Sequence, residues 1–182
     1  MKILKTYIRV VDAVNYRIGR VVMYGIFVLM GILLWSSISK TFFLPSLWTL
    51  EMAQFVMVGY YILGGPYSLQ MGSNVRMDLL YGEWTPRRKA GVDCLTVLFL
   101  IFYLGVLLKG GIDSTAYSFK YGGERSPSAW RPYLWPIKVT MCIGIGLMLL
   151  QALSELAKDI LRLRGQWNFE GEDATAERAD AL

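Results

Sequence analysis

The chain has 182 residues, of which 54% are hydrophobic and 18% charged, with a formal net charge of +5. It contains no histidine, which excludes bis-histidine haem, the usual catalytic zinc sites and serine–histidine hydrolases. A small membrane enzyme is one alternative, but a quinone-linked thiol oxidase would need paired outer cysteines and a membrane protease would need a base. Neither is present, so we expect a chain that is not an enzyme. It should have no catalytic, cofactor-binding or metal-binding residues and no nucleic-acid partner.

The first 17 residues show apolar side chains at helical spacing, with Lys2, Lys5, Arg9 and Asp12 marking the opposite side. This pattern predicts an amphipathic helix over residues 1–17 that lies in the membrane interface and contacts lipids. The alternative is a simple extension of the helix that follows.

Long apolar runs dominate the rest of the sequence. A helix needs about 20 apolar residues to cross a hydrocarbon layer of roughly 30 Å. The sequence therefore predicts an all-α integral membrane protein with a four-helix membrane domain over residues 18–163. An acidic, flexible tail is expected over residues 164–182. The predicted spans cover residues 18–39, 47–71, 92–117 and 134–153.

Lysine and arginine are distributed unequally between the two sides of the predicted spans. One side carries five in the first 20 residues, four in the loop after the second span and three just after the fourth. The other side carries four, in the two remaining loops. The positive-inside rule then predicts a multi-pass membrane protein with both termini in the cytoplasm.

Few ionisable residues lie within the spans. Glu51 falls about one turn into the second span, where it could serve as a coupling acid or simply reach water at the interface. Lys109 and Asp113 are spaced i, i+4 near the outer end of the third span and can form a structural pair. No charged residue lies near the middle of a span, so the midplane ion site of a self-sufficient transporter is missing.

The loop before the fourth span reads "KYGGERSPSAWRPYLWP" and is rich in glycine, proline and serine. This composition predicts an ordered turn region on the outer face rather than a helix. Arg125, Trp130 and Arg131 lie in it, and with Lys109 and Asp113 they are the candidate outer-face residues.

The two cysteines, Cys94 and Cys142, fall in antiparallel spans near opposite membrane faces. A disulfide requires Cα atoms within about 7 Å. We therefore expect two free thiols.

The connection "GSNVRMDLLYGEWTPRRK" links the second and third spans. Together with four spans, internal termini and an early glutamate in the second span, it resembles the DctQ-like family. This family forms the small membrane subunit of tripartite ATP-independent periplasmic (TRAP) transporters. The positions that match the family pattern, and that are candidates for structural or partner contacts, are Glu51, Gly72, Arg76, Asp78, Pro86 and Arg87.

This resemblance implies a supporting role in sodium-coupled uptake of an organic acid. A large permease subunit would carry substrate and sodium, and a periplasmic binding protein would deliver the substrate. Arg76 and Asp78 would anchor the connection or touch the partner. The alternative hypothesis is a small homo-oligomeric, ion-coupled exporter that uses Glu51.

Overall fold

The computed structural model describes residues 2–71, 86–121 and 123–163. This part of the chain is almost entirely helical and contains no strand apart from one isolated bridge. The helices are α1 (Lys2–Met23), α2 (Gly25–Phe42), α3 (Thr49–Gln70), α5 (Pro86–Lys120) and α6 (Trp135–Leu163).

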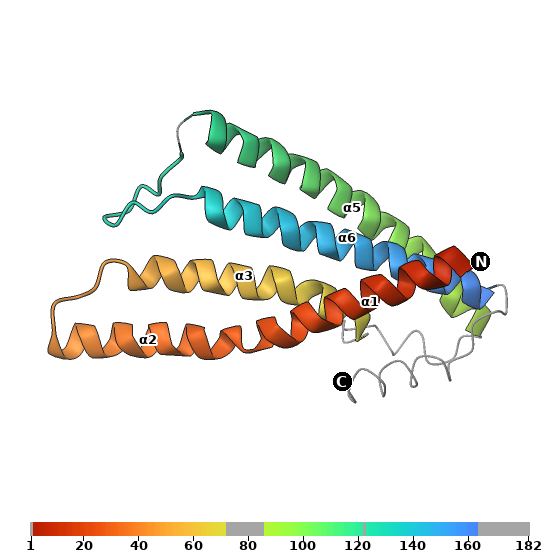
Figure 1. Ribbon diagram of the computed structural model, residues 1–182, viewed down its shortest axis with the longest axis horizontal. Coiled ribbons are helices and arrows are strands. Elements are labelled where there is room, and N and C mark those ends of the chain that lie inside the picture. The colour runs from red at the N-terminus through yellow and green to blue at the C-terminus, as the bar shows by residue number, and fades with distance from the viewer. Residues whose placement is uncertain (1, 72–85, 122, 164–182) are drawn as a thin grey trace.

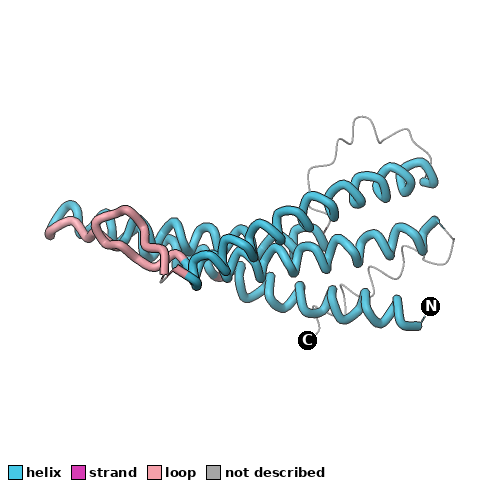
Figure 2. Tube along the Cα trace, turned by 90° about the horizontal axis from the view of Figure 1, so that it is seen from above, coloured by secondary structure: helices cyan, strands magenta, loops and turns pink. Residues whose placement is uncertain are grey.

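The helices form one elongated bundle (Figures 1 and 2). α1 and α2 follow one another with a break at Tyr24, and together they run the length of the molecule. α6 is the central helix, since it packs against α5, α3 and α1. The N-terminus and the C-terminal end of α6 lie at the same end of the bundle, which we call the terminal end. The opposite end, with the α2–α3 loop and the loop before α6, is the hairpin end.

Three described segments are long and apolar enough to cross a membrane: Leu4–Phe42, Leu95–Lys120 and Trp135–Leu161. α3 is not among them. Besides Glu51 and Gln54, its sequence contains three tyrosines, three glycines, a proline and a serine, which lower its mean hydropathy. α3 packs along both α2 and α6, so it lies beside these two helices in the bundle. A fourth membrane span over residues 47–71 stays a prediction.

The first segment is much longer than a membrane is thick. At 1.5 Å per residue its 39 residues extend for about 58 Å, roughly twice the hydrocarbon layer. The helix predicted to end at residue 17 instead continues to Met23. Part of this segment therefore lies at or beyond the membrane surface, and an interfacial position for α1 remains a prediction.

The apolar side of α1 packs against the bundle only in part. Ile8 and Val11 are buried, but Val14 is 43% exposed. Asp12, on the polar side of the predicted amphipathic helix, also faces the bundle, because its carboxylate pairs with Lys158 of α6. A charged partner on α6 makes this face of α1 partly polar.

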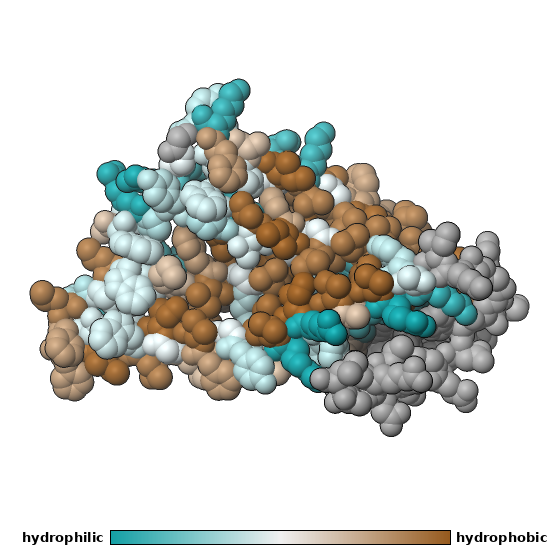
Figure 3. Space-filling view, viewed as in Figure 1, coloured by the Kyte–Doolittle hydropathy of each residue, from teal (hydrophilic) through white to brown (hydrophobic). Residues whose placement is uncertain are grey.

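Glycines set two close helix contacts. A Cβ atom added at Gly144 of α6 would lie 2.3 Å from the side chain of Ile62 in α3, and one at Gly19 of α1 would lie 2.4 Å from Tyr67. Large apolar side chains instead cover much of the outward faces, as Figure 3 shows for one side. Such a surface suits a lipid environment, where close packing rather than apolar burial holds helices together.

We predict that Gly144→Ala lowers the melting temperature of the purified chain in detergent. Overpacking costs about 1–3 kcal/mol, which outweighs the gain of about 0.5–1 kcal/mol from replacing a helical glycine. Gly146→Ala is the matched control, because a Cβ there meets no atom within 4 Å. A Gly144→Ala protein as stable as the Gly146→Ala protein would contradict the close contact.

Candidate functional site

Buried polar side chains gather at the two ends of the bundle. At the terminal end, one set joins α1 to α6, and we call it the terminal network. Its members are Asp12, Asn15, Gln151, Ser154, Glu155 and Lys158.

Lys158 is the cation of the terminal network. Its side chain is 5% exposed, and its Nζ lies 2.9 Å from Asp12 Oδ2 and 2.8 Å from Glu155 Oε1. Asp12 Oδ1 also accepts a hydrogen bond of 3.2 Å from Ser154. A buried ammonium group is tolerated only with such partners, because the cost of removing it from water is several kcal/mol.

Gln151 connects the remaining members of the network. Its Nε2 donates to Asp12 at 3.0 Å and to Glu155 at 3.1 Å, and its Oε1 accepts from Asn15 at 2.7 Å. Gln151 is fully buried and Asn15 is 2% exposed. These bonds fix both the rotation and the height of α1 against α6.

The hairpin end has a second polar cluster that joins α5, α6 and the loop between them. Lys138 forms an ion pair with Glu124 and donates to the buried hydroxyl of Ser118 at 2.8 Å. Ser118 in turn donates to Glu124 at 3.1 Å. The hydrogen bond from Lys138, with help from Ser118, lowers the pKa of Glu124 from its ordinary value of 4.5.

Residues 123–134 form an ordered turn, which we call the hairpin. Its two sides meet at an antiparallel bridge between Arg125 and Tyr133, and the Arg125 guanidinium lies 4.5 Å from the centre of the Tyr133 ring. Ser126 N–H donates to Pro132 at 3.0 Å. The prediction of an ordered turn rather than a helix is confirmed for these residues. Trp130 and Arg131 are exposed near the tip, with Arg131 at a positive φ of 51°.

Glu51 lies in the first turn of α3, at the hairpin end. It is 9% exposed, and its Oε1 accepts a hydrogen bond of 3.4 Å from Ser126 of the hairpin. Its Oε2 is buried without a hydrogen-bond partner among the described residues. The structure thus brings Glu51 beside the segment that holds Arg125, Trp130 and Arg131.

The other candidate residues are not joined to these clusters. Lys109 and Asp113 are exposed on α5, and no ion pair joins them. Gly72, Arg76 and Asp78 lie outside the described residues, as does the tail 164–182, and of Pro86 and Arg87 only the helical backbone is described. Their roles in structure or partner contact stay predictions. Cys142 is a free, half-buried thiol.

The described residues contain no group of three or more His, Cys, Asp or Glu side chains that could hold a metal ion. Ion pairs at both ends and apolar helix faces between them suit a protein that is held in a membrane and contacts other chains.

A comparison with protein families identifies residues 29–162 as the DctQ component of tripartite ATP-independent periplasmic transporters. The chain belongs to the DctQ family. It is therefore the small membrane subunit of a TRAP transporter, and this family is a transporter component rather than an enzyme family. No curated protein and no solved structure was found to match the chain significantly.

The DctQ match begins inside α2, so α1 lies before it. The terminal network thus joins a helix outside the matched segment to one almost wholly within it. As a component of a tripartite system, this DctQ chain has two implied partners, a large permease and a periplasmic binding protein.

The sequence reasoning missed the terminal network, although a signal was present. Gln151, Ser154, Glu155 and Lys158 recur at i, i+3, i+4 and i+7, which puts them on one side of a helix. Such a polar stripe beyond a membrane span indicates a packed polar face. Counting Lys158 only as a cytoplasmic charge hid it.

We predict that Lys158→Met and Asp12→Asn each destabilise the DctQ chain and that their effects are not additive. Removing one partner of a buried ion pair typically costs about 3–5 kcal/mol, because the other charge is left buried. Thermal unfolding in detergent of the single and double variants measures the coupling. Lys40→Met is the control, since Lys40 is exposed. Additive effects, or a Lys158→Met protein as stable as this control, would disprove the coupling.

We also predict that Glu124→Gln loosens the hairpin at neutral pH. A carboxyl group whose pKa is lowered on folding contributes stability above its unfolded pKa and loses it as the pH falls through the folded pKa. Hydrogen exchange at the Ser126 and Leu134 amides, which donate across the hairpin, should be severalfold faster in the variant.

The difference between Glu124→Gln and wild type should shrink as the pH falls through the lowered pKa of Glu124, because the wild-type carboxylate then becomes neutral too. Asp113→Asn, an exposed acidic residue on α5, is the control and should exchange like wild type. Equal hairpin exchange in all three proteins at neutral pH would show that the Lys138 pair does not hold the hairpin.

Proposed function

We propose that this DctQ subunit supports sodium-coupled uptake of an organic acid by a large permease subunit, which a periplasmic binding protein supplies with substrate. The family match over residues 29–162 carries the proposal. The proposed location is the bacterial inner membrane with both termini in the cytoplasm, as the lysine and arginine distribution predicts.

The distribution of polar groups supports a role as a static support. The terminal network lies at one end, and the Lys138 and Glu51 contacts lie at the other. In the described parts of α2, α3 and α6, no charged side chain lies midway between these ends. On α5, the exposed Lys109 lies one half-turn from Gly111, which packs against Cys142 of α6. A transporter that binds its own ion usually has polar groups at the midplane, where interrupted helices meet.

The position of Glu51 also favours the supporting role over the exporter hypothesis. Its carboxylate is tied to the hairpin through Ser126, at the start of α3 rather than at mid-depth. We propose that it anchors the hairpin on α3. Arg125, Trp130 and Arg131 would then be presented at a fixed position on the outer face.

The experiment is reconstitution in liposomes with a sodium gradient and the cognate binding protein. The small chain alone should give no uptake above empty liposomes, the large subunit alone little or none, and both together full uptake. Removing the sodium gradient should abolish uptake by the complete system.

Glu51→Gln separates the two hypotheses. In the complete system, uptake per assembled complex should match that of wild type, because the residue only holds the hairpin. Uptake of a substrate or a lipophilic cation by the small chain alone, lost in Glu51→Gln, would refute the supporting role and establish the exporter.

A further inference from the structure

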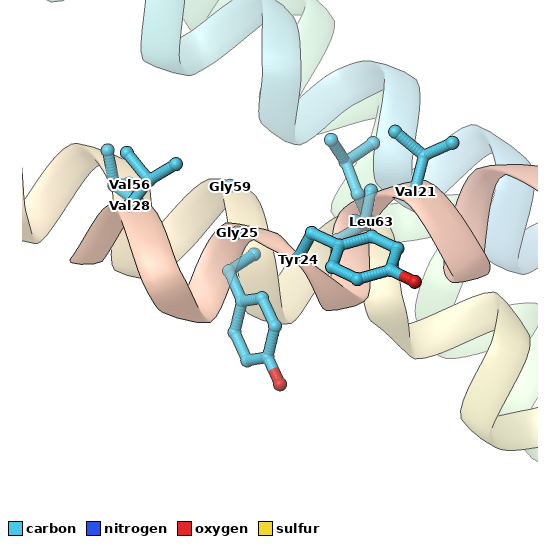
Figure 4. Close-up of a pocket in the computed structure, with 9 residues that line it drawn as sticks. Val21, Tyr24, Gly25, Val28, Val56, Gly59 and Leu63 are labelled. Carbon is cyan, nitrogen blue, oxygen red and sulfur yellow. The ribbon is translucent and has the colours of Figure 1, made fainter. Parts of the chain in front are cut away.

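An apolar groove runs beside the break between α1 and α2. It has a volume of about 380 Å³. Val21, Tyr24 and Val28 line one side, and Val56 and Leu63 of α3 line the other. Figure 4 shows Val28 near Val56 toward one end of the groove and Val21 near Leu63 toward the other.

The groove exists because of small residues and a local change in the backbone. The helix is interrupted at Tyr24, whose N–H donates to Val21 O rather than to the residue four positions back. Gly25 and Gly59 are also part of the lining and contribute no side chain. Val21 is 72% and Val28 57% exposed, so the groove opens sideways, away from the bundle.

Two arginines, Arg17 and Arg20, lie beside the end of the groove nearest the N-terminus. Arg17 lies four positions before Val21, and Arg20 lies four positions before Tyr24; both Val21 and Tyr24 line the groove. The arginines therefore share its side of the helix, one turn closer to the terminal end. Arg17 is exposed, and Arg20 lies against the ring of Tyr16, donating to its hydroxyl at 2.6 Å.

The dimensions match one leaflet of a bilayer. From Arg17 to Val28 a helix rises about 16 Å, and half of the hydrocarbon layer is roughly 15 Å. Val28 therefore lies close to the depth at which an acyl chain ends when the headgroup of its lipid sits beside Arg17. Basic side chains beside an apolar space between membrane helices favour anionic lipid headgroups.

We propose that this groove binds one anionic phospholipid of the leaflet at the terminal end. Its phosphate contacts Arg17 and Arg20, and one acyl chain lies along Val21, Tyr24 and Val28 against α3. The apolar lining holds the acyl chain, and the charge of the two arginines selects an anionic over a zwitterionic lipid.

The experiment uses the purified full chain with phosphatidylglycerol that carries a photoreactive acyl chain, and phosphatidylcholine with the same chain for comparison. Crosslinks from phosphatidylglycerol should concentrate in residues 21–28 and 56–63. Native mass spectrometry should show one retained phosphatidylglycerol in preference to phosphatidylcholine.

Two variants test the two parts of the site. Arg17→Gln with Arg20→Gln leaves the groove intact and should weaken phosphatidylglycerol retention by about 5- to 30-fold, at ~1 kcal/mol per basic residue. Lys40→Gln, at the hairpin end of α2, should retain the lipid. Val28→Trp should fill the groove and abolish the crosslinks, whereas Leu34→Trp, at an exposed position outside it, should not.

Three results would overturn the proposal. One is crosslinking spread evenly over the exposed helix faces, which would show only bulk lipid. Another is equal retention of the two lipids by wild type and by the double arginine variant. The third is loss of the groove crosslinks when the large subunit is co-purified, together with protein–protein crosslinks at the same residues, which would make a helix of that subunit the occupant.

Discussion

The buried ammonium group of Lys158 holds the first and last helices of this bundle together. Within the membrane, apolar side chains gain little free energy by exchanging lipid for protein contacts. Helices therefore associate through close packing and polar bonds. Lys158 supplies such bonds to Asp12 across the α1–α6 interface and to Glu155 within α6. Gln151 extends them to Asn15. This network helps to fix α1 against α6, while Gly19 sets the close contact of α1 with Tyr67 of α3.

The two polar ends leave the faces between them free for other contacts. At the hairpin end, Glu124 and Lys138 tie the hairpin to α6, while Ser126 ties it to Glu51 of α3. Between the ends, packing rests on small residues such as Gly144 against Ile62. A subunit built in this way can present apolar helix faces to lipid along much of its length.

The N-terminal helix adds a feature that the family match does not cover, since the match starts at residue 29. The terminal network fixes α1 against α6, and the break at Tyr24 joins α1 to α2. This arrangement sets the groove next to Arg17 and Arg20. The proposed lipid would then bridge α1, α2 and α3 from outside, while the terminal network bridges α1 and α6 from inside.

The sequence by itself determined the helical membrane class, the family and the ordered hairpin. These features depend on residues that are neighbours in the sequence, namely the long apolar runs and the loop rich in glycine and proline. The resemblance was predicted from spaced residues such as Gly72 and Asp78, and the family match confirmed it. Only the tertiary structure decided which side of α1 faces the bundle, because Asp12 reads as an outward charge until Lys158, far along the chain, is placed opposite it. The contact between Glu51 and Ser126 and the groove at Tyr24 likewise depend on residues that only folding brings together.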